Sequence, residues 1–133
     1  MLRIVKRTSR GKPRPKSPHD LLVAQICDYL NSALPRRAFF TVIFNGGGRN
    51  MIRGPSLESQ GVKRGLMDVL ILYDRKAYCL EAKAGKDTLS PEQRQTHAEI
   101  QDALVPIGVV RSVDDVQRFL RDDCGLWLRA TPQ

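Results

Sequence analysis

Two short apolar segments that follow each other closely determine the expected fold of this chain. Residues 66–73 (LMDVLILY) and 77–83 (AYCLEAK) are rich in strand-forming residues, and the polar residues 74–76 separate them. Two such runs around a short polar stretch are typical of an antiparallel β-hairpin. We therefore expect a sheet that contains this hairpin.

Three charged residues lie inside these apolar runs. Successive side chains of a strand alternate between its two faces, so Glu81 and Lys83 share a face with Cys79. The residues expected on the opposite face are Tyr78, Leu80 and Ala82. Antiparallel pairing about residues 74–76 brings Asp68 close to Glu81 and Lys83. A charge inside an apolar strand costs free energy unless it is used or paired, so we expect the three charges to meet at one sheet edge.

Two acids and a lysine in this arrangement suit the hydrolysis of a phosphodiester bond. Neighbouring carboxylates repel each other unless a hard cation such as Mg²⁺ or Mn²⁺ lies between them. Such a cation can bind a phosphate oxygen, while Lys83 can orient the attacking water and offset the charge that builds on phosphorus. The alternative interpretation is a salt bridge on a solvated strand edge. The turn before Asp68, residues 61–65 (GVKRG), contains glycines that permit close backbone approach, as a site beside a polyanion needs.

Helix and strand signals predict the elements around the hairpin. Before the hairpin they predict a helix from Ser17-Pro18 to about residue 32, a strand at 39–44 and a glycine-rich loop at 45–50. After it they predict a helix begun by the capping box of Ser90 and Gln93 and a strand at 107–111. A last helix, capped by Ser112 and Asp115, is expected to reach about residue 122. The sequence therefore predicts an α/β fold in which helices flank a mixed central β-sheet.

The order of several motifs resembles the VRR-NUC branch of the PD-(D/E)XK nucleases over roughly residues 18–121. The motifs are Asn45, the 61–65 turn, Met67-Asp68, Glu81-Ala82-Lys83-Ala84-Gly85-Lys86, Leu89-Ser90-Pro91-Glu92-Gln93 and Val110-Arg111-Ser112. The resemblance implies a restriction-endonuclease-like fold of αβββαβα order. It implies that Asp68, Glu81 and the Ala82 carbonyl bind the metal and that Lys83 is catalytic.

Two positions depart from the family's pattern. Met67 stands where a proline usually precedes the first aspartate, at a position whose side chain does no chemistry. Many members carry a glutamate on the first helix that contributes to the metal shell, and this chain has His19 and Asp20 there. Either residue could replace that acid, or neither. Asp20 also suits the first turn of a helix, where a negative charge favours the helix dipole.

Two further residues on the second expected helix have open interpretations. The resembled family has a glutamine near its active site at the position of Gln93, which makes Gln93 a catalytic candidate. The capping box with Ser90 explains the same residue without chemistry, and we expect the two roles to need different rotamers. His97, in the middle of that helix beside Glu99, is interpreted as a surface residue rather than a catalytic base.

Basic residues indicate a polyanionic partner. The net charge is +8, and residues 1–16 hold seven basic residues and no acid. We expect this stretch to be a flexible arm that contacts phosphates in a salt-dependent way, or otherwise a solubilising tail. Residues 17–133 are expected to form one nuclease-like domain. The candidates for nucleic-acid contact are Asn45, Arg49, Lys63, Arg64, Lys86 and Arg111. The glycine loop could also be a mere connection, and Arg111 could merely end its strand.

These observations predict a Mg²⁺- or Mn²⁺-dependent DNA endonuclease, and the resemblance implies a homodimer that acts on branched DNA such as four-way junctions. The alternatives are a restriction-type or repair nuclease for flaps or linear duplex, a non-catalytic nucleic-acid-binding protein on a nuclease fold, and a basic structural protein. Three cysteines without metal-ligand spacing (Cys27, Cys79 and Cys124) fit buried reduced thiols. With no apolar stretch of about 20 residues, we expect a soluble cytoplasmic protein without a membrane partner.

Overall fold

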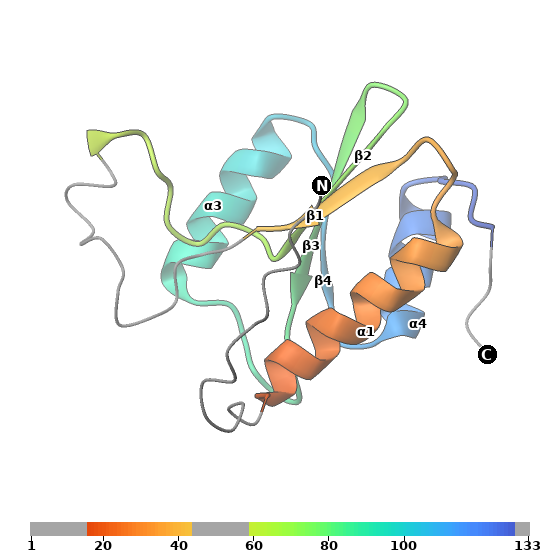
Figure 1. Cartoon of the computed structure of the whole chain (residues 1–133). Coiled ribbons are helices and arrows are strands. Elements are labelled where there is room, and N and C mark those ends of the chain that lie inside the picture. The colour runs from red at the N-terminus through yellow and green to blue at the C-terminus, as the bar shows by residue number, and fades with distance from the viewer. Residues whose placement is uncertain (1–15, 44–58, 130–133) are drawn as a thin grey trace, which may run out of the picture.

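The computed structural model describes residues 16–43 and 59–129 (Figure 1). Several sequence predictions lie outside these residues: the basic arm apart from Lys16, the end of the first strand at Phe44, and the glycine loop with Asn45 and Arg49. Within the described part of the chain, no helix is both long and apolar enough to cross a membrane.

A mixed four-stranded sheet forms the centre of the fold. Its strands are β1 (Phe39–Val42), β2 (Val69–Tyr73), β3 (Lys76–Ala82) and β4 (Ile107–Val110). They lie in the order β1-β2-β3-β4; the first two pairings are antiparallel and β3 pairs with β4 in parallel. The prediction of an α/β fold with a mixed sheet is thereby confirmed.

The predicted hairpin forms with a shorter turn than expected. Tyr73 pairs with Lys76, so the turn consists of Asp74 and Arg75 alone. Both turn residues have positive φ, 51° and 66°, as in the two-residue turns whose twist matches that of the flanking strands. The prediction that Lys76 belongs to the turn was therefore wrong, and this residue begins β3 instead.

Helices cover both faces of the sheet. They are α1 (Pro18–Ala33), α3 (Pro91–Asp102) and α4 (Val113–Arg118), and the last continues into the π-helical turn η1 (Phe119–Asp123). Figure 1 shows α1 and α4 on one side of the strands and α3 on the other. The strand residues Tyr78, Leu80 and Ala82 lie in the main core, as the alternation of β3 predicted.

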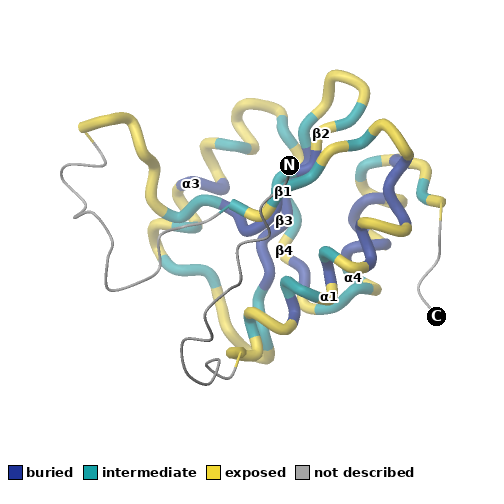
Figure 2. The backbone as a smooth tube through the Cα atoms, in the orientation of Figure 1, coloured by how far each residue is buried: buried dark blue, intermediate teal, exposed yellow. Residues whose placement is uncertain are grey.

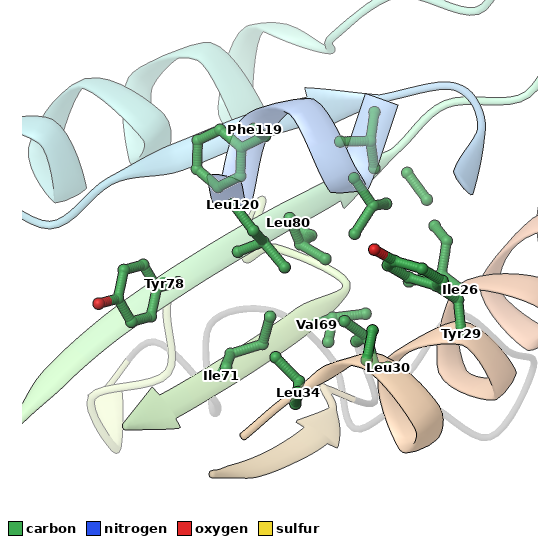
Figure 3. Close-up of a cluster of buried hydrophobic side chains, with 14 of the residues drawn as sticks. Ile26, Tyr29, Leu30, Leu34, Val69, Ile71, Tyr78, Leu80, Phe119 and Leu120 are labelled. Atoms are coloured by element: carbon green, nitrogen blue, oxygen red, sulfur yellow. The ribbon is translucent and has the colours of Figure 1, made fainter. Parts of the chain in front are cut away.

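The main core lies between the sheet and the helices α1 and α4 (Figure 3). Helix α1 contributes buried side chains at the spacing of a single helical face: Leu22, Ile26, Tyr29, Leu30 and Ala33. Figure 2 shows that buried residues follow the central strands and the inner sides of these helices. Cys79 is buried and Cys27 and Cys124 are half buried, and all three are free thiols. Burial raises the pKa of the Cys79 thiol to about 11.

Capping boxes begin the two longer helices. Ser17 accepts a hydrogen bond from the Asp20 N–H group (3.1 Å), and the Asp20 carboxylate accepts one from the Ser17 N–H group (3.4 Å). The same reciprocal pair joins Ser90 and Gln93 at the start of α3. Each box satisfies backbone donors that the helix itself leaves without partners.

The glycine-bounded turn at 61–65 packs against α3. Gly65 has a φ of +71°, and a Cβ atom added there would lie 2.6 Å from the backbone carbon and oxygen of Glu92. The Thr96 hydroxyl donates to the Arg64 carbonyl at 2.5 Å. The close approach that Gly65 permits is therefore to the backbone of α3, while close approach of this turn to a polyanion stays a prediction. At Gly61 a Cβ atom would meet nothing within 4 Å.

We expect Gly65→Ala to lower the free energy of unfolding by about 2–4 kcal/mol, the sum of left-handed backbone strain and a clash that backbone atoms cannot relieve. Gly125→Ala is the matched control, because Gly125 has a φ of +69° and open space around its Cα; strain alone costs about 1–2 kcal/mol there. Urea unfolding of both variants measures the difference. Equal losses would contradict the packing of this turn on α3.

Candidate functional site

Asp68 lies immediately before β2 and is held through its main chain and its side chain. Its N–H group donates to the Leu80 carbonyl (3.0 Å), and its carbonyl accepts from the Ile43 N–H group (2.8 Å). Because Val69 also pairs with Leu80, two consecutive residues oppose one, as in a β-bulge, which redirects a side chain. The buried Asp68 carboxylate turns to β3, where Oδ2 accepts from the Ala82 N–H group at 2.8 Å.

Glu81 is the most deeply buried charged side chain of the site, with 1% of its surface exposed. Burial raises the pKa of its carboxyl group to about 9; a hydrogen bond to the Asp68 side chain and the charge of Asp68 act in the same direction, and Lys83 opposes them. The Glu81 carboxyl group therefore keeps its proton near neutral pH, beside the Asp68 side chain. The expectation that antiparallel pairing brings these two acids together is met by this geometry.

Gln93 joins Lys83 to the start of α3. Its Oε1 atom accepts from Lys83 Nζ at 2.8 Å and from the Ser90 N–H group at 2.9 Å. The prediction that the cap and the site need different rotamers was wrong, because one carbonyl oxygen has two lone pairs and serves both donors. Gln93 thus contacts the lysine of the candidate site while it caps its own helix.

His19, in the first turn of α1, reaches the acid pair from the opposite helix layer. Its Nε2 atom lies 3.2 Å from Asp68 Oδ1, and 42% of its side chain is exposed. Asp20 turns back to cap the helix and lies 3.9 Å from His19 Nδ1. Of the two residues that the sequence left open, His19 is the one in contact with the candidate site.

His97 was missed by the sequence analysis, which placed it on the surface. It is 6% exposed, and its Nε2 atom lies 3.0 Å from Glu81 Oε1. Burial and the nearby charge of Lys83 lower the pKa of the imidazole, which favours the neutral ring. The spacing was a usable signal, because residues four apart in a helix share a face and Gln93 had already been assigned to the site.

Four of the predicted nucleic-acid contacts lie within the described residues: Lys63, Arg64, Lys86 and Arg111. Lys63, Arg64 and Lys86 are exposed. A cleft of about 390 Å³ between the 61–65 turn and α3 includes Lys63 and Arg64 in its lining, but neither acid of the pair. The Arg111 guanidinium donates to the Gly85 carbonyl at 2.8 Å, which ties the segment after Lys83 to the end of β4. A role of these residues in DNA binding stays a prediction.

The donors present at the site fit a hard divalent cation. The described residues contain no group of three or more His, Cys, Asp and Glu side chains arranged to hold a metal ion. The predicted ligand set has two carboxylates and one backbone carbonyl, oxygen donors of the kind that Mg²⁺ and Mn²⁺ prefer. The raised pKa of Glu81 relieves the same repulsion between neighbouring carboxylates that a cation would relieve.

Comparison of the chain with models of protein families, with curated proteins and with solved structures finds no match. A function for this chain must therefore be inferred from its own residues and their geometry.

We expect the free energy of unfolding in EDTA to fall as pH rises from 7 to 8.5. The pKa of Glu81 is about 9 in the folded protein against a usual 4.5, so in this window the folded state binds a proton that the unfolded state has released. The slope from one such group is at most about 1.4 kcal/mol per pH unit. Glu81→Gln should remove this part of the slope, as measured by urea unfolding at several pH values.

Glu99→Gln, at an exposed position of α3, is the matched control for the loss of one carboxylate. An identical pH slope for the native chain and Glu81→Gln would show that Glu81 is ionised in the folded protein.

Proposed function

We propose that this chain is a Mg²⁺- or Mn²⁺-dependent DNA endonuclease with a restriction-endonuclease-like fold, related to the VRR-NUC branch. The observation that carries the proposal is that two buried acids lie side by side: the Asp68 carboxylate accepts a hydrogen bond from the N–H group of Ala82, the residue after Glu81. Lys83, two residues beyond Glu81 on the same strand face, completes the set of charges. The succession of α1, three strands, α3, β4 and α4 supports the proposed fold.

Asp68, Glu81 and the Ala82 carbonyl would hold the cation. When bound, it would supply Lewis acidity at the scissile phosphate. The bond from the Ala82 N–H group to Asp68 Oδ2 orients the first carboxylate from the main chain of β3. Glu81 is closed off from solvent, and attraction between unlike charges is stronger in such a low-dielectric setting. Both acids are thus oriented by the fold before any ligand arrives.

Lys83 would orient the attacking water and offset the negative charge that develops on phosphorus. Its hydrogen bond to Gln93 restrains a long flexible side chain, and a restrained donor loses less conformational freedom in the reaction. Lys83 is only half buried, and we propose that a substrate reaches it from solvent. Gln93 would therefore act by positioning Lys83.

The proposed substrate is DNA recognised by its structure, such as a four-way junction, and the proposed assembly is a homodimer. The net charge of +8 supports a polyanionic substrate, as do the exposed residues Lys63, Arg64 and Lys86. The preference for branched DNA and the dimer rest on the motif resemblance. A second active site in a dimer would allow both strands to be cut.

Cleavage of four-way-junction, flap and linear duplex DNA in Mg²⁺, Mn²⁺ or EDTA tests the proposal. We expect metal-dependent cutting by the native chain and a loss of at least about 100-fold in each of two variants. Asp68→Ala removes a proposed ligand of the cation, and Lys83→Ala removes the positive charge that would offset the charge developing on phosphorus. Lys76→Ala is the matched control, since Lys76 is an exposed lysine at the other end of β3.

Cutting that survives both substitutions would overturn the site assignment. DNA binding without cutting under any metal would favour a non-catalytic nucleic-acid-binding protein. Preferential cutting of flaps or linear duplex would favour a restriction-type or repair nuclease.

A further inference from the structure

His97 has no part in the chemistry described above, yet it is buried against one of the proposed metal ligands. Its Nε2 atom lies 3.0 Å from Glu81 Oε1, and the two side chains are 8% and 1% exposed. A buried polar group without a hydrogen-bond partner lowers the stability of the fold by about 1–3 kcal/mol. The contact therefore satisfies both side chains, and it also fixes the direction in which the Glu81 carboxyl group points.

The register between α3 and β3 makes this contact one of a pair. Gln93 and His97 lie four residues apart on α3, a rise of about 6 Å. Glu81 lies on β3 and Lys83 just after its end, two residues along an extended chain or about 6.6 Å. Gln93 contacts Lys83 and His97 contacts Glu81. Because the two spacings nearly match, one face of α3 contacts both Lys83 and Glu81. The helix runs antiparallel to the strand, since the earlier helix residue contacts the later strand residue.

Contacts outside this pair hold the helix in that register. Gly65 lies against the backbone at Glu92, and the Thr96 hydroxyl donates to the Arg64 carbonyl. The capping box fixes the first turn of α3. Helix α3 is therefore a firm support from which a side chain can orient a carboxylate.

We propose that His97 is a positioning residue for the metal ligand Glu81, an inference that rests on the proposed function. The imidazole Nε2–H group donates to Oε1 and leaves Oε2 for the cation. Without this bond the carboxylate has one restraint fewer, so more conformational entropy is lost when a cation binds and orders it. Partners that orient a metal ligand in this way typically change metal affinity by about 10- to 100-fold.

Mn²⁺ binding to the full chain, measured by isothermal titration calorimetry, tests this role without relying on catalysis. We compare His97→Leu, which fills the space without a donor, with His97→Gln, whose side-chain amide can donate near the position of Nε2. We expect His97→Leu to bind Mn²⁺ about 10- to 100-fold more weakly and His97→Gln to regain most of the affinity. Gln117→Leu is the matched control, because it replaces a buried polar side chain by leucine on α4, on the other side of the sheet from α3.

Urea unfolding in EDTA establishes that each variant is folded under the binding conditions. Native affinity in His97→Leu would overturn the inference, and so would equal weakening in the Leu and Gln variants, because packing rather than the hydrogen bond would then be responsible. If the native chain binds no Mn²⁺, the metal site itself fails and the inference falls with it. If His97→Leu alone binds weakly while the native chain binds Mn²⁺ but cuts no DNA, His97 positions a metal ligand and the nuclease proposal fails separately.

Discussion

The interaction between the carboxyl groups of Asp68 and Glu81 is the constraint on which the rest of the candidate site depends. Asp68 and Glu81 come from neighbouring strands and are both buried, where like charges repel more strongly than in water. Burial, together with the neighbouring Asp68, raises the pKa of Glu81, so the Glu81 carboxyl group keeps its proton in the folded chain. A bound divalent cation would resolve the same conflict, and this equivalence connects the stability of the fold to the proposed chemistry.

Each charged member of the site has a polar partner from a helix. His19 of α1 contacts Asp68, while Gln93 and His97 of α3 contact Lys83 and Glu81. The strands bring the charges together, and the helices on the two faces of the sheet fix their directions. A buried polar cluster of this kind is stable only when its members are satisfied, and no buried side-chain nitrogen or oxygen among the described residues lacks a partner.

Several features of the fold and of the site could be predicted because they depend on local spacing. Alternation in β3 placed Leu80 in the core and Glu81 on the opposite face, and antiparallel pairing placed Asp68 near Glu81. The start of α1 followed from Ser17 and Pro18 in the same way. His97 was missed because its helix, PEQRQTHAEIQD, has no apolar stripe to mark its inner face. Its buried residues are Thr96 and His97, both polar, so hydrophobic periodicity carried no information about burial there.

The sequence by itself determined the hairpin, the pairing of the two acids and the capping signals of the helices, because each depends on residues close together in the chain. Only the tertiary structure decided which helix residues reach those acids. His19 rather than Asp20 contacts Asp68, because the Asp20 carboxylate is used at the helix cap. Gln93 serves both the cap and Lys83, and His97 reaches Glu81, because the packing of α3 on the 61–65 turn sets its rotation over the sheet. That rotation depends on contacts between segments far apart in the chain, which no local pattern encodes.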